Sequence, residues 1–92
     1  MRNPGRLQRQ ALSAAERSIQ ALGRGDPVSA RMAISTALDK DQTGIYVGVA
    51  DAVDVAAGML ERDEPITEGV WGHLADAVGP GPLQALVEAV RH

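Results

Sequence analysis

The chain has 92 residues and a formal net charge of −3, and its hydrophobic residues include one Trp, one Tyr and no Phe. This length fits one domain with a modest core, and the absence of Cys excludes disulfides, thiolate nucleophiles and Cys-ligated zinc. No apolar run approaches the roughly 18 residues of a transmembrane helix, and no apolar segment after residues 1–5 indicates a secretory signal. These features predict a soluble, cytoplasmic protein that does not engage a membrane.

Charge is distributed unevenly along the chain. Residues 1–31 carry six Arg against Glu16 and Asp26, a net charge of +4, whereas residues 32–92 carry three basic residues against ten acids, a net charge of −7. We expect these halves either to pair with each other or to bind an oppositely charged partner, which includes a second copy of the chain.

The first predicted helix follows a short arm. Residues 1–5 contain Asn-Pro-Gly and no apolar anchor, which is typical of a flexible N-terminal arm. From Arg6 to Leu22, apolar residues recur at three- and four-residue steps, as on the buried face of a helix. Gly23 and Gly25 then end the helix, because glycine adopts the left-handed cap conformation without a Cβ penalty.

A nine-residue pattern that ends this helix occurs twice. Ala21–Ser29 and Met59–Thr67 share Leu-x-Arg, an acid-Pro step, a β-branched residue and a hydroxyl, at an offset of 38 residues. Each copy combines a helix stop with a helix start, since Asp or Glu before Pro suits the first turn of a helix. The pattern predicts a second helix after Asp26-Pro27 and a fourth after Glu64-Pro65.

Two further helices complete the prediction. A third runs from about Gly44 to Arg62 with Thr43 as its N-cap, and a strand over Ile45–Val49 is the alternative. Its two internal glycines, Gly48 and Gly58, suggest that a neighbouring helix approaches closely. The break at residues 79–82, Gly-Pro-Gly-Pro, predicts a last helix over 82–91.

These elements predict an all-α protein, a compact bundle of four to five helices built from two similar helical hairpins. A single domain, residues 6–92, follows the arm at 1–5. It comprises one hairpin at 6–40, a second at 44–78 and the C-terminal helix at 82–91.

Residues 13–46 resemble one tetratricopeptide repeat. The resemblance rests on Gly25-Asp26, then Ala30, Ile34 and Ala37-Leu38, which follow the Gly-x4-Ala-x3-large-x2-Ala-Leu spacing of that repeat. Ala14, Arg17 and Ser18 depart from it, standing where an aromatic residue, a Leu and a small residue are usual. The resemblance implies a helix-turn-helix unit of a class that mostly binds other proteins, and two such units favour closure into a bundle over an open solenoid.

The turn after the second helix resembles the opening of an EF-hand calcium loop. Asp39, Asp41 and Thr43 stand at its first, third and fifth positions, with Gly44 at the sixth. The twelfth position, which should be a bidentate Glu, is Ala50. We therefore predict no metal site and keep Asp39, Asp41 and Thr43 only as weak candidates beside an ordinary acidic turn.

Nothing in the chain predicts catalysis or a cofactor. There is no Gly-x-Ser-x-Gly, no phosphate-binding glycine loop and no third ligand beside His73 and Asp76. We expect no enzyme activity and no cofactor.

A non-catalytic module for protein–protein interaction or self-association is the leading prediction. Its candidate partner-binding residues are Trp71, if exposed, and Arg6, Arg9 and Arg17 of the basic first helix. The alternative is a nucleic-acid-associated or regulatory protein that uses the same Arg-rich helix. Nucleic acid is the less expected partner, because residues 1–31 contain no aromatic side chain and the sequence pI is about 5.2.

Overall fold

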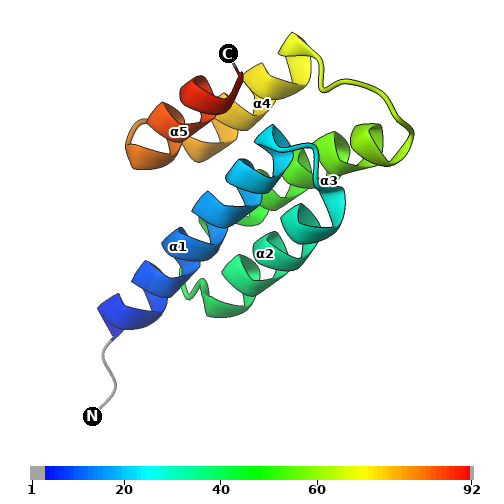
Figure 1. The fold of residues 1–92 in the computed structure, drawn as a ribbon. Coiled ribbons are helices and arrows are strands. Elements are labelled where there is room, and N and C mark those ends of the chain that lie inside the picture. The colour runs from blue at the N-terminus through cyan, green and yellow to red at the C-terminus, as the bar shows by residue number, and fades with distance from the viewer. Residues whose placement is uncertain (1–3, 92) are drawn as a thin grey trace.

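A computed structural model describes residues 4–91, which form five helices (Figure 1). These are α1 (Pro4–Gly23), α2 (Pro27–Lys40), α3 (Val47–Glu61), α4 (Glu68–Val78) and α5 (Pro82–Arg91). The described residues contain no strand, so the all-α prediction is confirmed and the strand alternative for Ile45–Val49 is wrong.

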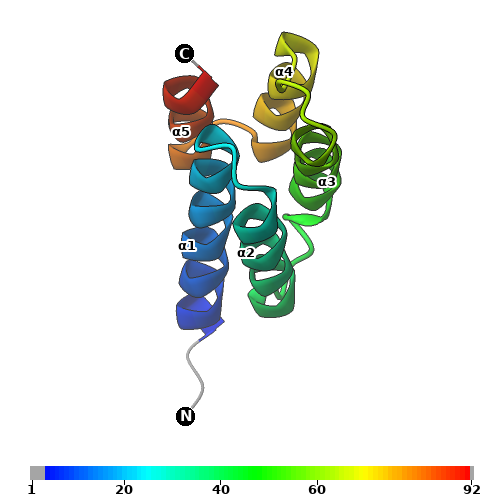
Figure 2. The same ribbon diagram turned by 45° about the vertical axis from the view of Figure 1, so that its right-hand side comes forward.

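The helices close into a ring. Each packs against the next along the chain, and α5 returns to contact α1, which also touches α3. Figure 1 shows α1, α2 and α3 side by side in alternating directions, and Figure 2 shows α4 and α5 at the end of the bundle where α1 finishes. The extents of 46 × 24 × 18 Å describe an elongated bundle rather than an open solenoid.

Small side chains dominate the core of the first hairpin, α1–α2. Helices packed through alanine can approach closely, because little side-chain volume separates their backbones. Six alanines of this hairpin are at most 1% exposed: Ala11, Ala14, Ala15, Ala21, Ala30 and Ala37. The second hairpin, α3–α4, buries four alanines, Ala52, Ala56, Ala57 and Ala75, together with the larger Val49, Val53, Trp71 and Leu74.

The doubled sequence pattern forms the same helix cap twice. The backbone N–H of Asp26 donates to the carbonyl of Ala21, and that of Glu64 donates to the carbonyl of Met59, each at 2.9 Å. Gly25 (φ 74°) and Asp63 (φ 58°) hold the left-handed position of this six-residue closure. The two copies are therefore equivalent C-caps, in which the left-handed residue lets the chain turn back over the last carbonyls.

The helices that follow these caps begin differently. Asp26 caps α2 by accepting the backbone N–H of Ser29 at 3.0 Å, with Pro27 in the first turn. The predicted start of the fourth helix at Glu64-Pro65 is wrong. Glu64 instead accepts a hydrogen bond from Arg62 Nε at 3.0 Å, and α4 begins three residues after Pro65, where Thr67 Oγ1 accepts the N–H of Val70.

Two other predicted starts are also corrected. Pro4 and Gly5 belong to α1 rather than to an arm, since proline suits the first turn of a helix; residues 1–3 lie outside the described part of the chain. Thr43 does not cap α3, which begins at Val47 after Gly44 adopts a φ of 76°.

The glycine at the closest helix contact is Gly23, rather than either glycine inside α3. A Cβ on Gly23 would lie 2.9 Å from Cβ of Val90, so its absence lets α1 and α5 meet. A Cβ on Gly48 would be 3.9 Å from Ala77 Cβ, an ordinary contact, and one on Gly58 would meet only the guanidinium groups of Arg62 and Arg31. The predicted close helix approach at Gly48 and Gly58 is therefore wrong.

Candidate functional site

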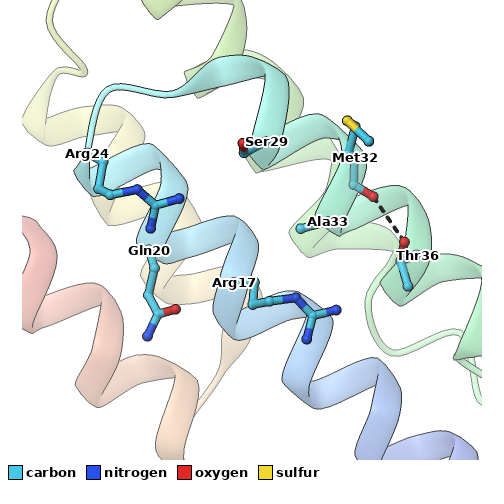
Figure 3. Close-up of a pocket in the computed structure, with 7 residues that line it drawn as sticks. All are labelled: Arg17, Gln20, Arg24, Ser29, Met32, Ala33 and Thr36. Carbon is cyan, nitrogen blue, oxygen red and sulfur yellow. Dashed lines mark hydrogen bonds between the residues drawn. The ribbon is translucent and has the colours of Figure 1, made fainter.

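A groove runs along the outer surface between α1 and α2 (Figure 3). Its main hollow has a volume of about 440 Å³, and a second hollow of about 300 Å³ continues it through the shared residues Arg17 and Thr36. Helix α1 contributes Gln10, Ser13, Arg17 and Gln20, and Arg24 follows directly after α1. Helix α2 contributes Ser29, Met32, Ala33, Thr36 and Lys40. We call these ten residues the α1–α2 groove. None of them is acidic.

The helical period explains why polar residues line one side of α1. The groove residues of α1 recur at three- and four-residue steps, so they share a face that lies beside the face of the buried alanines. Arg6 continues this line toward the start of the helix. Arg6, Arg17 and Arg24 are separated by 11 and 7 residues, close to whole numbers of turns, and they span about 27 Å.

Five cations of the first hairpin carry unpaired charge. Within residues 4–91, Arg31, Arg62 and Arg91 form ion pairs with carboxylates, whereas the remaining basic residues form none: Arg6, Arg9, Arg17, Arg24 and Lys40. Arg17 Nη1 donates a hydrogen bond of 3.1 Å to Ser13 Oγ, which leaves its charge uncompensated. Three of the five, Arg17, Arg24 and Lys40, line the groove.

The acidic half of the chain pairs with the basic half only in part. Arg31 of α2 donates to Glu61 at 2.8 Å and to Asp54, both on α3. These hydrogen bonds raise the pKa of Arg31, and the bond from Arg31 lowers the pKa of Glu61. Arg91 pairs with Glu68 at 2.7 Å. The predicted internal pairing is therefore found at Arg31, whereas the groove cations form no ion pair. Hydrogen bonds from Ser29 lower the pKa of Asp26, and Arg24 contributes to this lowering only through its charge.

The acidic turn between α2 and α3 is organised by Asp41. Its carboxylate accepts hydrogen bonds from Gln8 Nε2, from the N–H and hydroxyl of Thr43, and from the N–H of Tyr46, all within 3.0 Å. Burial opposes ionisation of this carboxyl, but the hydrogen bonds from Gln8, Tyr46 and Thr43 outweigh it and hold the pKa of Asp41 well below its usual value. Asp41 thus ties the turn to α1, and its oxygens are already occupied.

Asp39, by contrast, is exposed and does not join this cluster. Among residues 4–91, no three Asp, Glu or His side chains are grouped so that they could hold a metal ion.

The other predicted partner residues differ in position. Trp71 is only 7% exposed and belongs to the core of the second hairpin, so its use as an exposed anchor is excluded. Arg6 and Arg9 are exposed on α1 and lie outside both groove hollows. Arg17 lies where the two hollows meet.

Residues of α2 complete the site. The apolar steps of the sequence place Met32 and Val28 on the buried face of this helix, which is wrong, because the two are 68% and 64% exposed. Met32 stands on the α2 wall, whereas Val28, one turn away, lies outside the groove hollows. The signal that could have located this wall is the run Ser29, Ala33, Thr36 and Lys40, which recurs at three- and four-residue steps along the helix.

No family model, curated protein or solved structure matches this chain. Within the described residues, no helix combines the length and apolar character that a membrane span requires.

Proposed function

We propose that this chain is a cytoplasmic, non-catalytic interaction module that binds an acidic segment of a protein partner through the α1–α2 groove. The observation that carries the proposal is the cluster of unpaired cations on the first hairpin. Arg17, Arg24 and Lys40 line a groove that contains no carboxylate, while the paired Arg31, Arg62 and Arg91 lie elsewhere.

Unpaired surface cations favour an acidic partner because they carry no internal compensation that binding would have to break. Acids on the partner would replace water at exposed guanidinium groups, a gain that is modest for each pair and cumulative along a face. The opposite charge of the remaining helices would orient the encounter and disfavour approach by the wrong surface.

A protein is favoured over a nucleic acid by the position of the aromatic residues. Single-stranded nucleic acid is held partly by bases stacked on exposed aromatic rings. Trp71 and Tyr46, the only aromatic residues of the chain, are both buried, at 7% and 6% exposure. The acidic second hairpin would also repel a polyanion that extends beyond the groove.

The proposal is tested with a glutamate-rich peptide and charge variants. We expect the peptide to bind with an affinity that falls as salt rises, and Arg17→Gln/Arg24→Gln to weaken binding roughly tenfold, the effect of losing two charge contacts. Fluorescence anisotropy of the labelled peptide measures both effects. Arg62→Gln is the matched control: Arg62 occupies the position of Arg24 in the second copy of the cap, and we expect it to change binding little.

Three outcomes would contradict the proposal. Equal binding by wild type and the double variant would remove the groove from the interaction. Tighter binding of an oligonucleotide of the same charge would favour the nucleic-acid alternative. Sedimentation showing that the chain assembles with itself through the groove would replace the acidic partner by a second copy.

A further inference from the structure

We infer that the partner segment which the α1–α2 groove accepts is an amphipathic acidic helix, with carboxylates toward α1 and apolar side chains toward Met32 of α2. This inference rests on the proposed function and specifies the conformation and the side-chain pattern of the partner.

The two walls of the groove differ in chemistry. The α1 wall carries Arg17, Arg24 and the amides of Gln10 and Gln20, all of which can donate hydrogen bonds to carboxylates. The α2 wall carries Ser29, Thr36 and Lys40 and, between them, the apolar Met32 and Ala33; the flexible thioether side chain of Met32 adapts to an apolar neighbour. A partner with one acidic and one apolar flank therefore satisfies both walls, which a uniformly acidic segment does not.

The shape of the groove suits a helix. Both walls are straight helices, and the groove follows α1 from Gln10 to Arg24, about 21 Å, which a helix of about 14 residues spans. The backbone groups of α1 and α2 are already bonded within these helices. An extended peptide would therefore gain no main-chain hydrogen bonds here, whereas a helix satisfies its own.

The cation spacing specifies where the carboxylates should lie. Arg17 and Arg24 are seven residues apart on one face, so two acids seven residues apart on a helix lying along α1 would meet both. Lys40, the last residue of α2, adds a third cation at the end of the groove that Gln10 and Ser13 also line.

Two peptides of identical composition test the inference. Both have about 20 residues, enough for marginal helicity in water. One places Glu at seven-residue intervals and Leu along the adjacent face; the other permutes the same residues so that no helical face is apolar. We expect wild type to bind the amphipathic peptide roughly tenfold more tightly than the permuted one. Circular dichroism should show helix gained on binding the amphipathic peptide alone.

Protein variants separate this inference from the proposed function. We expect Met32→Ser, at a site 68% exposed, to leave the fold intact and remove most of the difference between the peptides. Arg17→Gln/Arg24→Gln should weaken both peptides, and Arg62→Gln neither.

Equal affinity for the two peptides, with both dependent on Arg17 and Arg24, would overturn the helix inference and leave the proposed function standing. The same holds if Met32→Ser leaves the peptide difference unchanged. An oligonucleotide or anionic vesicle that displaces the amphipathic peptide at equal charge concentration would overturn the inference in favour of another anionic partner. Binding insensitive to Arg17 and Arg24 would overturn both.

Discussion

In both hairpins the first helix ends in the same C-cap, but the buried side chains of the second hairpin include a larger one, Trp71. Alanines pack α1 against α2, and three residues, 24–26, join these helices. The second hairpin has a six-residue link, 62–67, and buries Trp71 and Leu74. The difference shows that a repeated turn sequence sets where the chain reverses, while the residues between turns decide how closely the helices approach.

Their charges differ in the same way. In the second hairpin, four acids form ion pairs with arginines: Asp54, Glu61, Glu64 and Glu68. In the first, Arg6, Arg9, Arg17, Arg24 and Lys40 form no ion pair within residues 4–91. Folding therefore pairs several acids of the second hairpin with arginines and leaves the groove cations without an ion pair.

The largest effect is expected from Trp71→Ala. Truncating this buried ring leaves a cavity in the second hairpin, and we expect the free energy of unfolding to fall by about 3–5 kcal/mol. Urea unfolding followed by circular dichroism measures the change. Met32→Ala, an exposed control on the first hairpin, should change it by less than about 0.5 kcal/mol. A small effect at Trp71 would mean that the ring does not hold the second hairpin.

A smaller effect is expected at the turn that joins the hairpins. Asp41→Asn removes an acceptor for Gln8, Thr43 and Tyr46, and we expect a loss of about 1–3 kcal/mol of unfolding free energy. Because the folded pKa of Asp41 lies below its unfolded value, its stabilisation is present above the unfolded pKa, about 4, and is lost as pH falls toward the folded pKa.

Unfolding measured between pH 5 and pH 2 checks this sign. Wild type should lose more stability over this range than Asp41→Asn, which lacks the titrating carboxyl. The first hairpin also contains the Asp26 cap, whose pKa is lowered by hydrogen bonds from Ser29, whereas the Thr67 cap of the second does not titrate. Parallel losses in wild type and variant would contradict the role of Asp41.

Glycine substitutions test how closely the helices pack, with an effect smaller than that at the turn. Gly23→Ala places a Cβ 2.9 Å from Cβ of Val90, and we expect a net loss of about 1–2 kcal/mol after the better helix propensity of Ala is counted. Gly48→Ala is the matched control, because its Cβ meets only an ordinary contact; it should stabilise by up to about 1 kcal/mol. Thermal unfolding of both variants measures the difference. Stabilisation at Gly23 would show that α5 can move away freely.

The smallest effects are expected at the equivalent cap residues. Gly25→Ala should destabilise by about 1 kcal/mol, because L side chains are disfavoured at positive φ. Asp63→Gly should stabilise the second cap by up to about 1 kcal/mol for the same reason. If the two caps are equivalent, the free energy of unfolding in urea should fall for Gly25→Ala and rise for Asp63→Gly. Changes of the same sign would contradict this equivalence.

The sequence predicted the elements whose signals are local. Glycine, proline and acidic caps mark where α1 ends, where α2 begins and where α4 breaks before α5, and the apolar steps mark the helices between. The late start of α4 was missed because Glu64 pairs with Arg62 and does not cap the helix, and helix propensities do not predict such a pair. The tight contact at Gly23 was missed because it depends on α5, which is distant along the chain.

The candidate site was predicted only in part. Arg17 was named from the basic first helix, but the α2 wall with Met32 and Lys40 depends on how two helices lie side by side. Trp71 was named as an anchor only if exposed, and its spacing with Leu74 and Val78 already favoured the core position in which the structure places it. Whether a cation is paired also depends on tertiary neighbours, which explains why Arg31 and Arg24 could not be distinguished from sequence.

The central claim is that the unpaired cations of the first hairpin form the partner surface. An NMR titration of the isotope-labelled protein with the glutamate-rich peptide tests it most directly, because each backbone amide reports its own surroundings. We expect the shift changes to concentrate on the groove residues and to disappear in Arg17→Gln/Arg24→Gln. Changes concentrated on α3 and α4, or spread evenly over the five helices, would contradict it.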